Sequence, residues 1–263
     1  MRKYLFILKS ELMTNLQYIF NVLSNVAAYF VIIFIYINLW NYIYDDPSQL
    51  INGYTKTQMI WYVIFTEIIY FSLGGRKACI KLAEEVKSGR IAYTINKPYN
   101  YVLYSLFSHM GNVFIKSIIF MIVGLLVGAI FLGEFPALNI LNVLGLLLIF
   151  YIALIVNTLF IIVIGLFSFI IEDSVPMYWI YSKFTLICGA LFPIEFFPEK
   201  IQKVLQFSPV FAINYGPAKL FVNFSWNQLI AILISQLAYI AISYGLCMLV
   251  YRKGVKKLNV NGG

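Results

Sequence analysis

The chain has 263 residues, of which 62% are hydrophobic, 18% aromatic and only 11% charged, with a formal net charge of +8. Soluble domains carry about 25% charged residues, so this composition excludes an ordinary soluble protein and predicts a membrane protein. The cysteines are three and widely spaced (Cys79, Cys188 and Cys247), so they indicate neither a disulfide framework nor a metal site. Basic cytoplasmic loops account for the net charge, so nucleic-acid binding is not expected.

The N-terminal part predicts an interfacial helix followed by two membrane spans. Residues 1–17 place leucines at helical spacing among polar residues, which is typical of an amphipathic helix lying along a membrane. These leucines are Leu5, Leu8, Leu12 and Leu16. Residues 18–75 then hold two apolar runs, 18–44 and 57–73, with lengths that suit membrane-spanning helices.

A basic island follows at residues 76–98, with six of the nineteen basic residues of the chain. It reads RKACIKLAEEVKSGRIAYTINKP, and four of its apolar positions recur at helical spacing: Cys79, Leu82, Ala83 and Val86. The island therefore predicts a short amphipathic helix whose apolar stripe either docks into a groove of a partner or rests on anionic lipid. Gly89 suits the left-handed position that ends such a helix.

The rest of the chain predicts four more spans and one interrupted segment. Residues 99–192 contain three apolar stretches, within 102–132, 138–171 and 175–192. Residues 193–226 contain four prolines, which argue for short broken helices near one surface instead of one continuous helix. A sixth span is expected at 227–251, and residues 252–263 form a basic tail.

The distribution of basic residues predicts the orientation in the membrane. Six spans place both termini on the same side. The start, the island and the tail hold three, six and four basic residues, whereas the outer loops hold four. Because cytoplasmic segments carry the excess of Lys and Arg, we expect a multi-pass protein of the plasma membrane with both termini in the cytoplasm.

Three polar residues inside the spans are candidates for a translocation pathway: Glu67, Asn157 and Lys183. A charge at the middle of a membrane helix costs about 2.5–3.5 kcal/mol on insertion scales, so Glu67 and Lys183 are expected to face a partner or a wet cavity. They either line the pathway, form an ion pair between helices or point at the other subunit. Asn157 either lines the pathway or forms a hydrogen bond between helices.

Two stretches of the chain resemble the permease subunits of ABC-2 type exporters. The first follows the first two spans and has the pattern E-x-x-x-G-x-I with a following K-P, carried by Glu85, Gly89, Ile91, Lys97 and Pro98. The second reads GALFPIEFFP at residues 189–198, followed by Ser208-Pro209 and Tyr215-Gly216-Pro217. The similarity in order and spacing covers nearly the whole chain.

The resemblance implies that residues 1–263 form one all-α ABC-2 type transmembrane domain with six spans. The island becomes a coupling helix seated on a separate ATPase subunit, through Lys81, Glu84, Glu85, Gly89, Arg90, Lys97 and Pro98. Residues 193–226 become short outer helices, with a gate formed by Pro193, Glu195 and Pro198. The substrate would be an amphiphile exported from the cell.

The resemblance also implies partners. The chain lacks the pattern G-x-x-x-x-G-K-[ST] that cradles nucleotide phosphates, so no cofactor is expected in this chain, and ATP and Mg would be bound by an ABC ATPase. Two ATPase subunits and a second permease, identical or homologous, would complete the transporter within the bilayer.

Two other classes of membrane protein are weaker alternatives. An ion-gradient-driven secondary transporter commonly carries internal repeats, and no matching halves are found in this sequence. An intramembrane protease with the pattern E-E-x-x-x-R is suggested by Glu84 and Glu85, but Arg90 stands one residue too far along. With His109 as its single histidine, the chain offers no convincing catalytic set.

Overall fold

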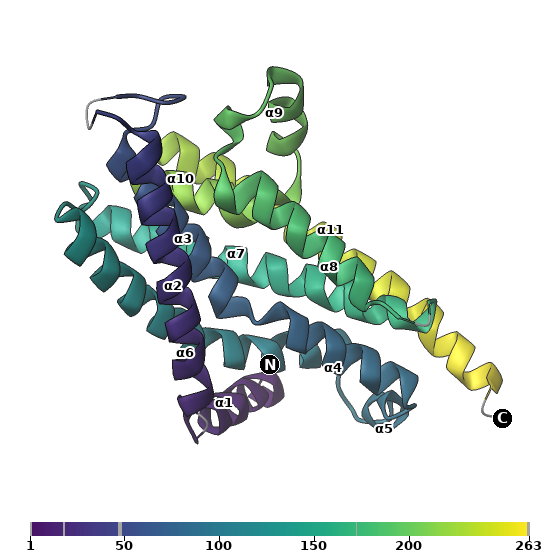
Figure 1. The fold of residues 1–263 in the computed structure, drawn as a ribbon. Coiled ribbons are helices and arrows are strands. Elements are labelled where there is room, and N and C mark those ends of the chain that lie inside the picture. The colour runs from purple at the N-terminus through teal and green to yellow at the C-terminus, as the bar shows by residue number, and fades with distance from the viewer. Residues whose placement is uncertain (1, 18, 47–48, 172, 262–263) are drawn as a thin grey trace.

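The computed structural model describes residues 2–17, 19–46, 49–171 and 173–261, and within these ranges the protein is all-helical, without a β-strand (Figure 1). The main helices are α1 (Arg2–Gln17), α2 (Ile19–Ile43), α3 (Lys56–Leu73), α4 (Gly75–Lys87), α5 (Ile91–Ile95), α6 (Tyr101–Leu132), α7 (Ile140–Leu166), α8 (Val175–Thr185), α9 (Glu199–Gln206), α10 (Gly216–Val222) and α11 (Trp226–Asn261). Four short 3₁₀ or π segments complete the fold: η1 (Phe167–Phe169), η2 (Leu186–Leu191), η3 (Ile194–Phe196) and η4 (Phe211–Tyr215).

Helix α1 lies crosswise at the N-terminal end of α2 instead of continuing it, and packs along α6 (Figure 1). The Tyr4 ring is buried and stacks on Phe107 of α6, with 5.5 Å between ring centroids. Leu5 and Phe6 are 58% and 71% exposed. A helix lying crosswise at the end of a bundle, with large apolar side chains turned outward, agrees with the expected interfacial position. Of the predicted leucines, Leu5 is exposed, whereas Leu8 and Leu12 are half-buried and lie beside Gly111 of α6.

Among the described residues, four helices are long and apolar enough to cross a membrane on their own: Ser24–Ile43, Tyr101–Leu132, Ile140–Phe169 and Trp226–Lys256. The other two predicted spans are less regular. Helix α3 has 18 residues, begins with polar residues and contains Glu67. Helix α8 has only 11 residues because its backbone passes into the π-helix η2. The long apolar helices make the chain a multi-pass membrane protein.

The last helix extends beyond the predicted span at 227–251. Helix α11 runs on to Asn261, so the basic tail continues the same helix. Gly254 lies inside this extension, and the Phe169 ring of η1 occupies the space that a Cβ atom at this position would need. The glycine therefore allows η1 to approach α11 closely.

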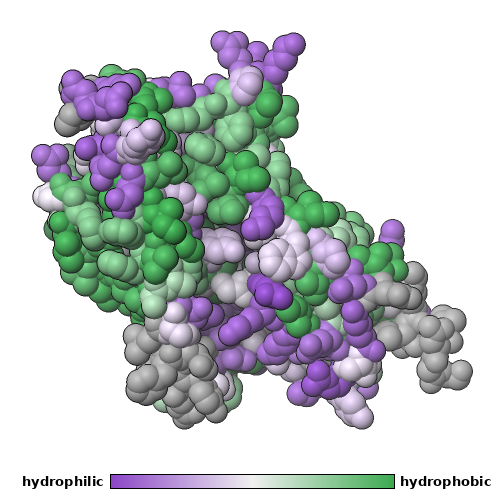
Figure 2. Space-filling view, viewed as in Figure 1, coloured by the Kyte–Doolittle hydropathy of each residue, from purple (hydrophilic) through white to green (hydrophobic). Residues whose placement is uncertain are grey.

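The two ends of the bundle differ in what they carry. Both termini, α1, α4 and α5 lie at one end, while the segment joining α2 to α3 and helix α9 lie at the other (Figure 1). Figure 2 shows hydrophilic surface at both ends and a hydrophobic region between them, over α2 and α6. Exposed side chains of these two helices include Phe34 (47%), Leu126 (57%) and Ile130 (77%). This band is the surface expected to contact lipid.

The proline-rich segment forms short broken helices, as the sequence predicts. Side chains of α3 and α11 stabilise the irregular backbone of η2, which precedes this segment, and of η4 within it. Tyr62 and Thr66 of α3 donate hydrogen bonds to the carbonyl oxygens of Gly189 (2.6 Å) and Ala190 (3.0 Å). Gln236 of α11 donates to the carbonyl of Ala212 at 2.9 Å. Non-helical backbone at membrane depth is tolerated only where such protein partners satisfy it.

Helix α3 lies at the centre of the core, and two small residues allow α6 to approach it. Gly124 packs against Ile68 and Gly128 packs against the indole of Trp61, in the space that a Cβ atom would fill. Trp61 is itself 1% exposed. The G-x-x-x-G pattern of α6 therefore serves close helix packing.

Candidate functional sites

The basic island folds into α4, which turns away from α3 at Gly74, a residue in the left-handed conformation with φ +53°. The apolar stripe of α4 is buried inside the chain: Cys79, Leu82, Ala83 and Val86 are 0%, 7%, 2% and 6% exposed. Leu82 fills the space beside Gly165 of α7. The prediction that this stripe docks into the groove of a partner is therefore wrong, because helix α7 of the same chain covers it.

The predicted coupling residues of α4 separate into two groups. Glu85 is half-buried and accepts a hydrogen bond from the Tyr101 hydroxyl of α6 at 2.8 Å. Lys81 and Glu84 are exposed. The ammonium of Lys87 lies 3.4 Å from the Asp173 carboxylate, and both side chains are about half exposed, so this ion pair contributes little to stability. Glu85 thus holds α4 against α6, while the exposed residues remain available to a partner.

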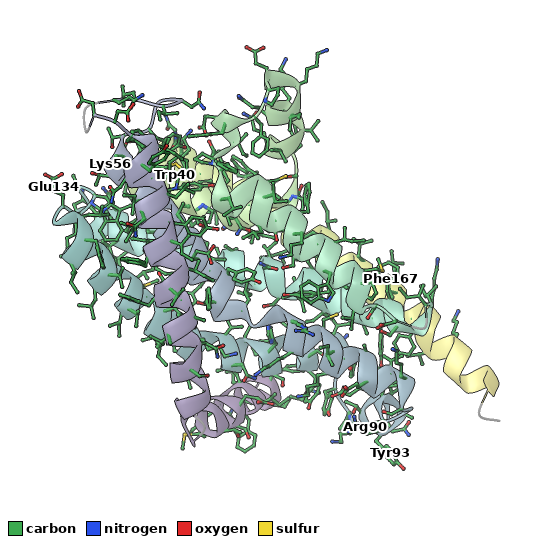
Figure 3. The ribbon with its side chains drawn as sticks, viewed as in Figure 1. Trp40, Lys56, Arg90, Tyr93, Glu134 and Phe167 are labelled. Carbon is green, nitrogen blue, oxygen red and sulfur yellow. The ribbon has the colours of Figure 1, made fainter. Side chains whose placement is uncertain are left out.

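The most prominent surface feature at this end is the turn and short helix after α4. Gly89 has φ +71°, which confirms the predicted left-handed helix end. Ile91 is 0% exposed and anchors α5, whereas Tyr93 is 80% exposed. Figure 3 shows Arg90 and Tyr93 projecting from the bundle below α4. We call residues 88–97 the basic tip.

Two further predicted residues lie at the end of the basic tip. Lys97 and Pro98 are exposed, and the Pro98 carbonyl accepts a hydrogen bond from the Lys3 ammonium. Tyr93 is not among the predicted coupling residues. The sequence IAYTI indicates that Tyr93 is exposed. Ile91 and Ile95 lie on one face of a helical turn, and Tyr93 lies on another.

The hypothesis that Glu67 and Lys183 form an ion pair within the chain is wrong. Glu67 is 2% exposed, inside the core, and lies near Tyr29 and Tyr36 of α2. Lys183 is exposed on α8, with its ammonium 5.9 Å from the centroid of the Trp179 ring. The two ion pairs found among the described residues include neither of them. Their helices present the two charges to different surroundings.

Asn157 joins two helices. Its side-chain oxygen accepts a hydrogen bond from the Tyr181 hydroxyl of α8 at 2.9 Å, and the residue is 7% exposed. Of the two roles considered for Asn157, this geometry favours the hydrogen bond between helices.

The predicted outer gate contains a polar cluster centred on Glu195. Its carboxylate accepts hydrogen bonds from Tyr215 (2.6 Å), from Tyr54 (3.2 Å) and from the Lys219 ammonium. Pro193 and Pro198 flank Glu195 at the starts of η3 and α9. The Glu195 carboxylate of η3 thereby joins three other parts of the chain: η4 through Tyr215, α10 through Lys219, and the segment before α3 through Tyr54. The sequence placed Glu195 in the gate, but its three partners come from residues far along the chain.

These contacts determine the ionisation of Glu195. Burial alone raises the pKa of its carboxyl, but the hydrogen bonds and the positive charge of Lys219 outweigh burial and hold the pKa below its ordinary value. The carboxylate therefore stays ionised at neutral pH. A group with a lowered folded-state pKa stabilises the fold fully above its ordinary pKa, about 4.3 for Glu, and loses this contribution as the pH falls through the lower value.

We expect Glu195→Gln to lower the stability of the protein at pH 7 by about 1–3 kcal/mol, because Tyr215 and Lys219 lose a charged acceptor. The difference from the wild type is expected to persist down to about pH 5 and to shrink in more acidic solution. Thermal unfolding in detergent from pH 7 to pH 3 measures it. Glu199→Gln, at an exposed position of α9, is the matched control. A difference that grew as the pH fell would contradict the assignment.

Comparison with known proteins agrees with this architecture. The family model described as "ABC-2 family transporter protein" matches residues 12–262, nearly the whole chain. No curated protein matches the sequence. The match spans α2 to α11, including the basic tip and the Glu195 cluster. The chain therefore belongs to the ABC-2 family of transporter proteins, as a multi-pass membrane component of a transporter.

Proposed function

We propose that the chain is the permease subunit of an ATP-binding cassette exporter. It would form half of a translocation pathway and move an amphiphilic substrate, such as a drug, a peptide or a lipid-like molecule, out of the cell. The observation that carries this proposal is the family match over residues 12–262, combined with an exposed basic tip at the end of the bundle that holds both termini.

In this proposal the chain crosses the plasma membrane six times. The crossings are α2, α3, α6, α7, α8 continued by η2, and α11, which run alternately between the two ends of the bundle (Figure 1). Both termini, α1 and the basic tip would lie in the cytoplasm, because their basic residues exceed those of the opposite end. The Glu195 cluster would then close the outer end of the pathway.

The basic tip would contact the ATPase. Arg90, Tyr93 and Lys97 are exposed on a segment anchored by the buried Ile91, so a movement of the ATPase would be transmitted to α4 and, through the Glu85–Tyr101 hydrogen bond, to α6. The transporter would contain two ATPase subunits, which bind ATP and Mg, and two permease subunits, identical or homologous. Lys183, exposed on α8, would line the pathway between the permeases.

An apolar cavity supports an amphiphilic substrate. It has a volume of about 300 Å³ and lies between α3, α6, α7 and α10. Aromatic side chains contribute much of its wall: Phe65, Phe135, Phe150 and Phe221. Ligand sites for molecules with apolar parts are typically concave and lined by such residues.

The test is reconstitution of the purified chain in liposomes, with and without an ABC ATPase, for which the products of neighbouring genes are the first candidates. We expect export of a fluorescent amphiphile only when the ATPase and ATP are both present. Substrate should also stimulate ATP hydrolysis by the complex and not by the ATPase alone. Transport by the chain alone, driven by an ion gradient, would overturn the proposal and favour a secondary transporter.

A further inference from the structure

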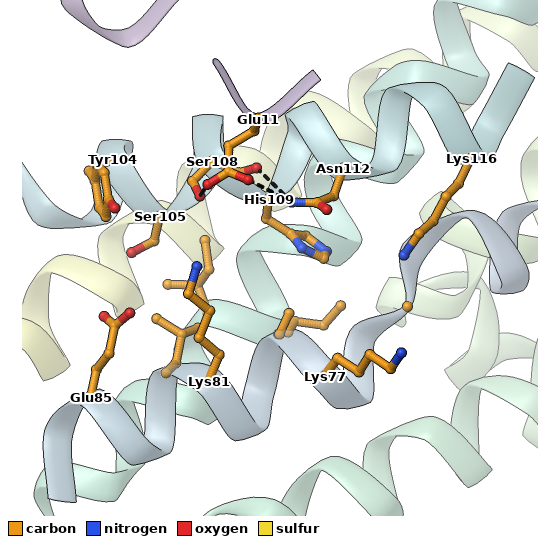
Figure 4. Close-up of a pocket in the computed structure, with 15 residues that line it drawn as sticks. Glu11, Lys77, Lys81, Glu85, Tyr104, Ser105, Ser108, His109, Asn112 and Lys116 are labelled. Carbon is orange, nitrogen blue, oxygen red and sulfur yellow. Dashed lines mark hydrogen bonds between the residues drawn. The ribbon is translucent and has the colours of Figure 1, made fainter. Parts of the chain in front are cut away.

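A polar cavity lies between α1, α4 and α6, at the end of the bundle with both termini (Figure 4). It has a volume of about 270 Å³, and its floor is formed by Ile161 and Ile162 of α7. Its polar walls carry three lysines, Lys77, Lys81 and Lys116, and two glutamates, Glu11 and Glu85. We call it the basic cavity. Neither the family match nor the proposed coupling role assigns it a ligand.

The two carboxylates of the basic cavity are occupied by neutral donors of α6. Glu11 accepts from the Ser108 hydroxyl at 2.8 Å and from the Asn112 amide at 3.4 Å, and Glu85 accepts from the Tyr101 hydroxyl at 2.8 Å. Within the described ranges, by contrast, Lys77, Lys81 and Lys116 take part in no ion pair. The three ammonium groups, which come from α4 and α6, thus outnumber the two carboxylates of the cavity, and in the described ranges none of them is paired with a carboxylate.

A further polar atom in the wall of the basic cavity has no hydrogen-bond partner among the described residues. The Nε2 atom of His109 is buried and makes no hydrogen bond with the described part of the chain. In Figure 4 its ring lies between Lys81 of α4 and Asn112 of α6, facing the cavity. Lys116 reaches across from α6 to the start of α4, where its ammonium lies beside Gly74. A buried polar atom without a partner costs free energy unless a ligand or water completes it.

We propose that the basic cavity binds a phosphate group, carried by an anionic phospholipid or present as free phosphate. A phosphate offers one or more negative charges and several acceptor oxygens, which match three lysines, and lysine is a common phosphate ligand. The tautomer of His109 that carries its proton on Nε2 would add a fourth donor. About 270 Å³ is well above the roughly 10–15 Å³ that admit one water molecule, so the cavity has room for the group and part of its alcohol.

The surroundings favour the phospholipid as the source. Helix α1 borders the basic cavity through Glu11, and its outward face exposes Leu5, Phe6 and Met13 by 58%, 71% and 58%. An interfacial helix of this kind lies at the depth of the lipid headgroups. Basic pockets between membrane helices on the cytoplasmic side bind anionic headgroups in this way. A bound headgroup would contact lysines of both α4 and α6 and so hold the two helices together. Its binding does not require the ATPase.

The test is thermal unfolding of the purified full-length protein in detergent. Phosphatidylglycerol, phosphatidylcholine or inorganic phosphate is added. We expect phosphatidylglycerol to raise the apparent melting temperature by about 4 °C or more, since a ligand of the folded state stabilises it by mass action. Phosphatidylcholine, whose choline cation cancels the phosphate charge, should have little effect. An equal rise with inorganic phosphate would identify the free ion as the ligand.

Variants assign the effect to the basic cavity. Lys81→Met with Lys116→Met should abolish the rise, whereas Lys253→Met with Lys256→Met, at exposed positions of α11, should keep it. If the double variant does not fold, the single variants Lys77→Met and Lys81→Met replace it, since both positions are exposed. Each of them should reduce the rise in melting temperature. Bound phosphatidylglycerol is then counted by native mass spectrometry. The proposal is overturned if neither phosphatidylglycerol nor phosphate stabilises the wild type, or if the cavity variants respond like the wild type.

Discussion

Replacing Tyr93 by alanine together with Arg90→Glu is expected to weaken binding of the ATPase subunit by about 30-fold or more. Exposed aromatic and arginine side chains are the commonest energetic centres of protein interfaces, and each such centre contributes about 2 kcal/mol or more when truncated. Tyr93 is 80% exposed and Arg90 is exposed beside it, so the double change removes both from one surface. The dissociation constant of the detergent-purified complex measures the effect.

The fold is expected to survive this double change, since neither side chain is packed inside the bundle. The anchor of α5 is Ile91, at 0% exposure, and it is not altered. A matched control places the same tyrosine change and an equivalent charge reversal at the opposite end: Tyr42→Ala, at 86% exposure, with Lys200→Glu on α9. The control should bind the ATPase like the wild type. If both variants bound equally well, the basic tip would not be the ATPase contact.

The positions of the helices could be predicted because their ends are marked locally. Helix α3 ends at Leu73, directly before Gly74, and α6 ends at Leu132, directly before Gly133; both glycines have positive φ. Helix α6 begins at Tyr101, after Pro98 and with Asn100 as its cap. Each of these signals acts within a few residues of the boundary. A single sequence is sufficient to read them.

The neighbours of each helix could not be predicted in the same way. Periodicity shows that Leu82 and Val86 share an apolar face of α4, but not whether a partner or the chain itself covers it. Helix α7 of the same chain covers it. The side chain opposite Gly165 becomes known only once α4 and α7 are placed together.

The polar sites show the same limit. Glu195 stood out in a proline-rich segment, yet Tyr54 and Lys219 come from elements 141 and 24 residues away. Glu67 and Lys183 invited pairing because they are opposite charges in apolar helices. Their pairing depends on how α3 and α8 are rotated, which no local signal specifies. The basic cavity likewise combines α1, α4 and α6, three helices whose contacts are tertiary.

Gly128→Val is expected to lower the apparent melting temperature by about 5 °C or more, because the added side chain disturbs the packing of α6 on α3. The Cβ atom would enter the space of the Trp61 indole, and Trp61 cannot move aside easily, because it is 1% exposed and its Nε1 donates to the Glu134 carbonyl at 2.8 Å. Overpacking of a core costs about 1–3 kcal/mol or more, and a protein of this size loses about 2–4 °C for each kcal/mol.

Gly245→Val is the matched control for this prediction, since it makes the same exchange within α11, where nothing lies within 4 Å of the added Cβ atom. Helix propensity changes equally in the two variants, so the difference between them isolates the contact with Trp61.

Membrane helices associate mainly through close packing, because lipid is as apolar as their side chains. Loss of this contact should therefore separate α6 from α3, and a limited-proteolysis time course should show faster cleavage near Glu134 in Gly128→Val. Equal melting temperatures for the two variants would mean that α6 and α3 can part slightly without cost, and that the small residues of α6 do not hold the core together.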